Sequence, residues 1–461
     1  MNPVRGPKPR IRSRVAFGFC LVAALAGLVS PNRDQGASRE KEFTLDNGLR
    51  VVLYEKRNLP LLNIAAAVDA GSKDETEATS GLAHLLEHYI LFRGTEARSG
   101  SEVAREIRRH GAYFNAQTGQ DMAVFELSLP AEHAEFGLAN QKEILFNLKI
   151  DAKELEAEKD VVLEELSQIS DDPFRFASSL LYQNLFRGHP YGKPVYGTAQ
   201  AIRALTADQV ESFYRTRFVP AATTLAVVGD FALADMEAKV RACFGPVPKA
   251  EPVPTRIDPP APLPKTVEIE QELDVKEAYL VIGAAGPNYN SPDQYAVDLL
   301  TEILGRGISP MLYRPLKGNR DLINTASMSY ITLKRSGAIA VYLTLDLRRV
   351  AAAKSQALQF LRQVRNENFA KSDVFGDAQL TAYDFLESAR NQILFKLQQS
   401  RESGLSLATS LAMHLLFRDK PAGPDYLQGI RNVTSPDLRK AAAKYLAKTE
   451  YVVISIVPKK K

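Results

Sequence analysis

The chain has 461 residues and a mass of 50.9 kDa, which exceeds what one hydrophobic core usually serves and predicts two or three domains. A hydrophobic fraction of 45% and a charged fraction of 24% are typical of a folded globular protein. They exclude a disordered, collagen-like or polytopic membrane chain. Two cysteines in this length exclude a disulfide scaffold and a cysteine-rich zinc array.

The basic excess of the chain lies at its N-terminus. Residues 1–14 carry five basic residues and no acidic one, and an apolar run follows from Val15 to Val29. This pattern predicts a secretory signal peptide cleaved after Ala26, and the alternative is a short membrane anchor that is never cut. Removing residues 1–26 leaves 53 Lys+Arg against 54 Asp+Glu, so nothing in the charge favours nucleic-acid binding. We therefore expect an exported, periplasmic protein without an integral membrane domain.

Composition divides the rest of the chain into four segments. Residues 27–40 are predicted as a tether, 41–245 as an N-terminal domain, 246–265 as a linker and 266–461 as a C-terminal domain. The linker is the clearest boundary, because eight of the nineteen residues from 246 to 264 are proline. Such a stretch cannot continue a helix or a sheet and behaves as a semi-rigid spacer.

Local patterns suggest that the two halves are related. The turn residues at 46–48 predict a hairpin. A helix is predicted to open at Thr206 with capping-box spacing, and a strand follows at 223–228. At an offset of 228 residues, a helix opens at Thr434 and a strand follows at 451–456. This repetition favours two homologous α+β domains, each a mixed, largely antiparallel sheet flanked by helices.

The segment His-Leu-Leu-Glu-His from His84 to His88 has the spacing of a zinc site. Histidines four residues apart on a helix present both imidazoles on one face, so two ring nitrogens can reach one Zn²⁺. Glu87 is placed to take a proton from an attacking water molecule rather than to bind the metal. Thr79 or Ser80 can cap this helix. For so short a motif the alternative is an exposed His/Glu helix, and a third ligand is needed to decide.

The third ligand is sought in an acidic helix predicted at 154–169. Glu158 and Glu165 are seven residues apart and share one face, which we interpret as the inward one because Val161 and other apolar residues neighbour them. Glu164 is expected to face solvent. A buried carboxylate needs a cation or a donor, and a zinc site supplies one. The alternative is a helix whose charged side chains lie at a solvated interface.

Motifs along the first half resemble the pitrilysin/insulinase family of zinc metallopeptidases. The likeness is greatest to the short two-domain branch that includes mitochondrial processing peptidase and bacterial relatives. It covers nearly all of residues 43–248. The matching runs, in the family's order, are Asp69 to Glu75, Gly81 to His88, Phe92 to Thr95, Gly111 to Ala116, Glu158 to Glu165, His189 to Tyr191 with Gly197, and Val228 to Asp230.

The resemblance implies a Zn²⁺-dependent endopeptidase that hydrolyses small or unfolded polypeptides. It implies that Glu165 is the third zinc ligand beside the two histidines and that Glu158 supports a ligand from outside the coordination sphere. Glu87 is then the catalytic base. The resemblance also implies that Asn115 and Ala116 lie on an edge strand that pairs with extended substrate through main-chain hydrogen bonds. On the residues alone, Asn115 is better explained as a turn residue.

The second half matches the family's pattern less well. Catalytically complete chains carry an Arg and, seven residues on, a Tyr that bind substrate, whereas this sequence has Lys317 and Asn324. Lys keeps the charge without the bidentate fork, and Asn cannot replace a phenol. We therefore expect a sequence-related partner subunit that lacks the zinc motif and carries the Arg/Tyr pair. A homodimer, a self-closing monomer, a non-catalytic subunit and a peptide-binding module with a vestigial zinc are the alternatives.

Overall fold

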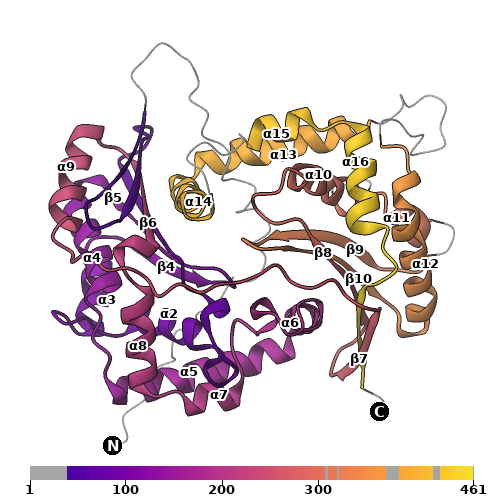
Figure 1. The fold of residues 1–461 in the computed structure, drawn as a ribbon, viewed down its shortest axis with the longest axis horizontal. Helices are drawn as coiled ribbons and strands as arrows, with labels where there is room; N and C mark the ends of the chain where they lie inside the picture. The colour runs from indigo at the N-terminus through magenta and orange to yellow at the C-terminus, as the bar shows by residue number, and fades with distance from the viewer. Residues whose placement is uncertain (1–38, 307–309, 319–320, 370–383, 419–425, 460–461) are drawn as a thin grey trace, which may run out of the picture.

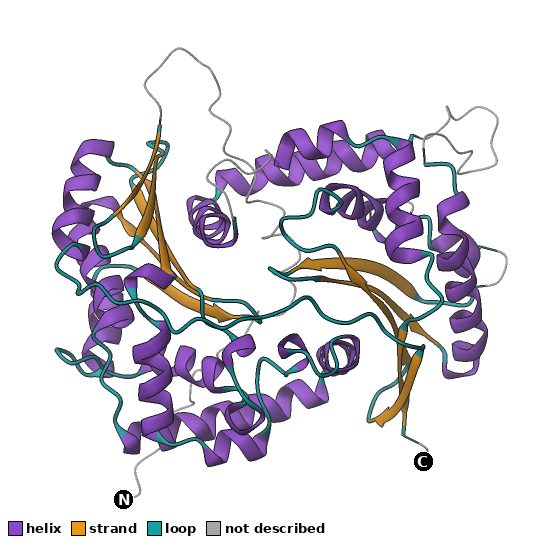
Figure 2. Ribbon diagram, in the orientation of Figure 1, coloured by secondary structure: helices purple, strands orange, loops and turns teal. Residues whose placement is uncertain are grey.

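The computed structural model describes residues 39–306, 310–318, 321–369, 384–418 and 426–459. The predicted signal peptide at 1–26 lies outside these residues. The described chain forms two β-sheets, each flanked by helices (Figures 1 and 2). None of its helices combines the length and the apolar character that a membrane crossing requires.

The first sheet has the strand order β1-β2-β6-β3-β5-β4. Its strands are β1 (Glu40–Thr44), β2 (Arg50–Glu55), β3 (Leu61–Val68), β4 (Tyr113–Thr118), β5 (Ala123–Pro130) and β6 (Thr223–Gly229). The predicted hairpin is confirmed, because β1 and β2 pair antiparallel on either side of residues 46–48. All neighbouring strands are antiparallel except β2 and β6. Strand β4 lies at an edge of the sheet.

The second sheet repeats this topology without a counterpart of β1, in the order β7-β11-β8-β10-β9. Its strands are β7 (Val267–Leu273), β8 (Ala278–Gly286), β9 (Thr325–Thr332), β10 (Gly337–Leu345) and β11 (Val452–Pro458). Like β6, β11 lies between one parallel and one antiparallel neighbour, and it is the strand found by the offset of 228 residues. The predicted α+β fold of two homologous halves is confirmed.

Helices cover both sheets and connect their strands (Figure 1). In the first half they are α2 (Leu82–Phe92), α3 (Gly100–Arg109), α4 (Ala134–Phe146), α5 (Ala152–Asp171), α6 (Pro173–Leu185), α7 (Ala199–Ala204), α8 (Ala207–Arg217) and α9 (Leu233–Phe244). In the second half they are α10 (Gln294–Gly305), α11 (Tyr313–Leu316), α12 (Val350–Gln363), α13 (Phe385–Glu402), α14 (Gly404–Phe417), α15 (Tyr426–Asn432) and α16 (Ser435–Ala441). Thr206 caps α8 in a capping box with Gln209, as its spacing predicts.

Two helices cross from one half to the other. Helix α14 of the second half packs on β3 and β6 of the first sheet, and α6 of the first half packs on β8 and β11 of the second sheet. The fit of α6 is close, because a Cβ added at Gly283 in β8 would lie 2.2 Å from Leu181 Cδ1. Each sheet therefore has one face covered by helices of its own half and the other face covered by a helix of the other half.

The proline-rich segment at 246–265 forms no helix or strand; it runs beside the first half and then crosses to β7 of the second half (Figure 1). Thr255 Oγ1 donates a hydrogen bond to Asp74 Oδ1 at 2.6 Å, and the guanidinium of Arg217 donates to the Val253 carbonyl at 2.5 Å. The segment is thus fastened by side chains at several points. Because these contacts hold it in place, it is not a free spacer, and we call the segment 246–265 the strap.

Candidate metal centre and active site

Helices α2 and α5 bring the predicted ligands together. His88 Nε2 lies 3.1 Å and His84 Nε2 lies 3.8 Å from the same oxygen of Glu165, Oε2. One donor atom from each of the three residues lies within 4.8 Å of the other two. Two imidazole nitrogens and one carboxylate oxygen form a donor set that suits a catalytic zinc ion, which takes three protein ligands and keeps one position open.

The start of α2 is fixed by a residue that sequence reasoning missed. Gly81 takes the N-cap position with φ = 90°, and a Cβ there would lie 2.7 Å from Gly197 Cα. The carboxylate of Glu75 accepts the backbone N–H groups of Gly81 and Ala83, both at 2.8 Å. Neither Thr79 nor Ser80 caps the helix, contrary to expectation. A buried carboxylate thus sets where the zinc-motif helix begins.

Two of the three donors, His84 and Glu165, are in the protonation state that a metal ion requires. Burial, reinforced by the neighbouring His88, lowers the pKa of His84 to about 3, so its imidazole is neutral at physiological pH. Burial alone would lower the pKa of His88, but hydrogen bonds with Glu158 and Glu165 raise it to about 9. Burial would raise the pKa of Glu165, yet the His88 hydrogen bond and the histidine charges lower it. Zn²⁺ would displace the extra proton of His88.

Glu158 orients His88 from the side away from the other ligands. Its Oε1 lies 3.2 Å from His88 Nδ1, and its Oε2 accepts from Arg93 Nε at 2.8 Å and Nη2 at 2.7 Å. The carboxylate is almost completely buried and is paired by these two partners. A carboxylate on the outer nitrogen of a ligand histidine fixes the ring and its tautomer. Arg93, just beyond α2, is a further site residue that spacing alone did not indicate.

The two remaining expectations about α5 have different outcomes. Glu164 is exposed, as predicted, and takes no part in the cluster. Val161 was expected to face inward, but 45% of its surface is exposed. The face that carries Glu158 and Glu165 is therefore defined by Val162 and Ile169, which are buried, and its edge opens to solvent.

Glu87 lies beside the three candidate ligands and is itself buried. Burial raises its pKa to about 7, while interactions with Thr118, at the end of β4, lower it. Its Oε2 and His84 Nδ1 are buried atoms without a hydrogen-bond partner in the described chain. A carboxyl that titrates near neutral pH and has one uncommitted oxygen can accept a proton from water and pass it on.

The two predicted substrate-binding residues lie on β4, at the edge of the first sheet. Among the described strands, β4 pairs only with β5, so its other edge retains free backbone groups. The Ala116 side chain is buried, and the Asn115 side chain hydrogen-bonds Glu126 on β5. Helix α2, which carries His84 and His88, packs against β4. An extended peptide added to this edge would pass beside the candidate metal site.

Lys317 and Asn324 are engaged elsewhere. Lys317 Nζ donates to the carbonyl groups of Ile323 and Asn324 at 3.3 and 3.2 Å, and Asn324 Nδ2 donates to Glu277 Oε2 at 2.7 Å. The neighbouring helix α11 lies at the far side of the second half from α2 (Figure 1). These two side chains are not brought to the metal ligands of their own chain.

Comparisons with known proteins agree with this architecture. A family model described as insulinase (peptidase family M16) matches residues 50–199, and one described as the peptidase M16 inactive domain matches residues 204–374. An uncharacterized zinc protease of Mycobacterium leprae is 27% identical over 72% of this chain and 74% of its own length. The uncharacterized zinc protease YmxG of Bacillus subtilis is 24% identical over 91% of this chain and 98% of its own length.

More distant likenesses include a eukaryotic subunit and solved structures. A probable mitochondrial-processing peptidase subunit beta of Arabidopsis thaliana is 25% identical over 60% of this chain and 52% of its own length. A protease from Helicobacter pylori shares the fold with a TM-score of 0.82 at 21% identity, covering 91% of this chain and 99% of the other. Together, the two family models span most of both halves, and the chain belongs to the insulinase family of peptidases, peptidase family M16.

Proposed function

We propose that this chain is the metal-bearing, catalytic chain of a zinc-dependent endopeptidase that hydrolyses small or unfolded polypeptides. The observation that supports this most directly is the convergence of His84, His88 and Glu165 from two helices, with Glu87 buried beside them. A non-catalytic subunit of the same fold would have no need of Glu87 and its uncommitted oxygen.

The side chains of the site divide the reaction between them. His84, His88 and Glu165 would hold the metal, and when bound Zn²⁺ supplies a Lewis acid that polarises the scissile carbonyl and acidifies the attacking water. Glu87 takes the proton of that water and then gives it to the leaving amine, which its pKa of about 7 allows in both directions. Glu158 and Arg93 hold the ring of His88 in place.

Substrate would bind as an added strand on β4. Main-chain hydrogen bonds at Asn115 and Ala116 recognise an extended backbone rather than a sequence, so selectivity is loose. A folded domain cannot present such a strand. The chain should therefore cleave an unfolded polypeptide, such as a reduced and alkylated protein, and leave its native form intact.

Zinc analysis and a peptide-cleavage assay on five variants test the catalytic proposal. His84→Ala, His88→Ala and Glu165→Ala should abolish stoichiometric zinc, whereas Glu164→Ala on the exposed face of α5 should retain it. Glu87→Gln should keep zinc and lose cleavage of a quenched peptide. Turnover by Glu87→Gln would contradict its role as base, and zinc-loaded wild type that never cleaves any peptide would support the non-catalytic alternative.

We further propose that a sequence-related partner subunit, which lacks the zinc motif and carries an Arg/Tyr pair, completes the substrate site. Lys317 and Asn324 form local hydrogen bonds within their own half, so this chain does not supply that pair to its own metal ligands. The isolated chain should cleave peptides slowly and gain activity when a candidate partner is added, with a heterodimer on size-exclusion chromatography. Full activity of the isolated chain, whether monomer or homodimer, would contradict this arrangement.

We also propose export to the periplasm through removal of residues 1–26, on the basis of the basic and apolar pattern of that segment. N-terminal sequencing of the protein purified from its own cells should begin after Ala26. Full-length chain in the cytosol would contradict export, and full-length chain in the membrane fraction would indicate an uncleaved anchor.

A further inference from the structure

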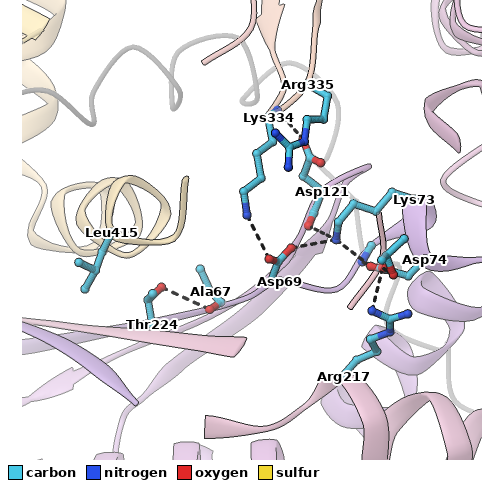
Figure 3. Close-up of polar contacts among 12 residues, drawn as sticks. Ala67, Asp69, Lys73, Asp74, Asp121, Arg217, Thr224, Lys334, Arg335 and Leu415 are labelled. Carbon is cyan, nitrogen blue, oxygen red and sulfur yellow. Dashed lines mark hydrogen bonds and ion pairs between the residues drawn. The ribbon is translucent and has the colours of Figure 1, made fainter. Parts of the chain in front are cut away.

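The β9–β10 hairpin of the second half reaches across to the first half (Figure 3). Its tip, residues 333–336, contacts two acidic residues. The backbone N–H of Lys334 donates to Asp121 Oδ2 at 2.8 Å, and Lys334 Nζ lies 3.1 Å from Asp69 Oδ2. Asp121 belongs to the turn between β4 and β5, and Asp69 directly follows β3. The hairpin tip thus touches the loops that surround the start of the catalytic helix.

Both carboxylate oxygens of Asp121 are used in this contact. Asp121 Oδ1 accepts from the Tyr191 hydroxyl at 2.7 Å, and the same hydroxyl accepts from the backbone N–H of Arg335 at 3.0 Å. Asp121 is only 3% exposed, and Tyr191 is fully buried. The hairpin tip therefore binds one buried carboxylate directly through Lys334 and indirectly through Arg335.

The β4–β5 turn is also held from its other side. Backbone N–H groups of Ser72 and Lys73 donate to the carbonyl groups of Gly119 and Gln120 at 3.1 and 3.0 Å. Lys73 Nζ, 7% exposed, lies 2.9 Å from Asp69 Oδ1 and donates to the Asp121 carbonyl at 2.8 Å. Figure 3 shows Asp69 between the ammonium groups of Lys73 and Lys334. The β4–β5 turn is thus held by contacts with the loop that follows β3 on one side and with the hairpin tip on the other.

The β4–β5 turn is connected to Glu87 through few intervening residues. Thr118, the last residue of β4, immediately precedes the turn, and helix α2, which carries Glu87, packs against β4. The loop that holds the turn also contains Glu75, which binds the first N–H groups of α2. Movement of the turn would therefore shift the end of β4 against the helix that carries Glu87.

We propose that the hairpin tip of the second half is a positioning element for Glu87, acting through Asp121, the β4–β5 turn and Thr118. Lys334 and Asp121 are positioning residues in this scheme, since neither touches the candidate metal site. The kinetic consequence rests on the proposed peptidase function, but the mechanical one does not. The second half would then contribute to catalysis without supplying a group to the reaction.

The kinetic test uses variants at both ends of the contact. Asp121→Asn replaces one acceptor oxygen by a donor, which must face either the Lys334 N–H or the Tyr191 hydroxyl. We expect kcat to fall by about 10- to 100-fold with KM and zinc content nearly unchanged, because a small displacement near the reacting groups has effects of that size. Lys334→Met, which removes only the ion pair to Asp69, should lose less, and Lys334→Arg should restore activity.

The matched control breaks a contact between the halves that does not touch the turn. Glu42 on β1 pairs with Arg418, just beyond α14. Glu42→Gln should leave kcat unchanged even if the melting temperature falls as far as it does in Asp121→Asn.

A second measurement needs no catalysis and is made on the metal-free chain. Amide hydrogen exchange over residues 113–123 should become about ten-fold faster in Asp121→Asn, since the grip of a charged acceptor on the turn is weakened. Exchange there should stay unchanged in Glu42→Gln. Unchanged exchange in both variants, or equal kcat losses in Asp121→Asn and Glu42→Gln, would overturn the positioning role. If wild type cleaves no peptide at all, the peptidase proposal fails, and the exchange result still decides this one.

Discussion

Two glutamates on one face of α5 occupy different places at the candidate metal centre. Glu165 places one oxygen near both histidine Nε2 atoms, whereas Glu158 holds the outer nitrogen of His88. Helical periodicity could predict that the two share a face, because a spacing of seven is two turns. It could not predict which of them approaches the Nε2 atoms of both histidines, since that depends on the relative placement of two helices. Arg93, which pairs with Glu158 across 65 positions, was equally beyond sequence patterns.

Glu158→Gln should weaken zinc binding by about 10- to 100-fold without eliminating it, as is usual for partners of a ligand histidine. The amide still accepts one hydrogen bond but no longer balances Arg93 and His88 electrostatically. Competition with a fluorescent zinc chelator gives the affinity. Asp160→Asn, an exposed change two residues further along α5, is the control and should leave the affinity unchanged. Wild-type affinity in Glu158→Gln would place this residue outside the site.

Asp298 on α10 should make the free energy of unfolding depend on pH. Burial raises its pKa to about 7, and the Tyr426 hydroxyl donates to its Oδ2 at 2.8 Å. Arg306 lowers the pKa and Glu302 raises it. An unfolded aspartate ionises near pH 4, so between about pH 4 and pH 7 the unfolded chain releases a proton that the folded chain keeps. The free energy of unfolding therefore falls as pH rises through this window.

Asp298→Asn removes this titration. The variant should gain stability relative to wild type as pH rises from 4 to 7, by at most about 4 kcal/mol, and the difference should then level off. Urea unfolding at intervals of one pH unit measures it. Asp160→Asn should show no such trend. A constant difference between Asp298→Asn and wild type over the whole range would show that Asp298 ionises normally in the folded chain.

At the scale of helices and strands, sequence patterns predicted those boundaries that are set by contacts between residues close together in the chain. The capping box at Thr206 sets the start of α8, and the hairpin at 46–48 joins β1 to β2. The start of α2 could not be predicted in this way. Its cap is the Glu75 carboxylate, which folds back over a loop, and Gly81 must adopt a left-handed conformation for the two to meet.

Glu75→Ala should therefore destabilise the zinc-motif helix at its first turn. Two backbone N–H groups inside the protein would lose their acceptor, which should cost about 1–3 kcal/mol in the free energy of unfolding. Chemical unfolding of the metal-free protein measures this loss. Glu77→Ala removes an exposed carboxylate from the same loop and should cost little. Equal stability of Glu75→Ala and Glu77→Ala would mean that α2 does not depend on this cap.

At the scale of the molecule, duplication was visible in the sequence but the exchange of helices was not. An offset of 228 residues pointed to two strands, β6 and β11, that have the same place in their sheets. The apolar residues of α6 and α14 show that these helices are buried, but they do not show against which sheet. Only the three-dimensional structure reveals that each helix covers the sheet of the other half.

This exchange predicts how the chain behaves when it is divided. A fragment of residues 39–250 lacks α14, so Ala65, Val228 and their neighbours on one face of the first sheet would be exposed to water. The fragment should bind a hydrophobic dye and aggregate, because a monomer rarely tolerates so large an apolar patch.

Cutting the chain has a different expected outcome when both halves remain present. A protease site inserted between Ala261 and Pro262, both exposed, should be cleaved without separating the halves, since α6 and α14 continue to cover the opposite sheets. The cut protein should elute at the volume of the intact chain on size-exclusion chromatography and keep its zinc. A fragment 39–250 that is monomeric, binds no dye and melts like the full chain would show that α14 is dispensable to the first half. The two halves would then be independent domains held mainly by their strap.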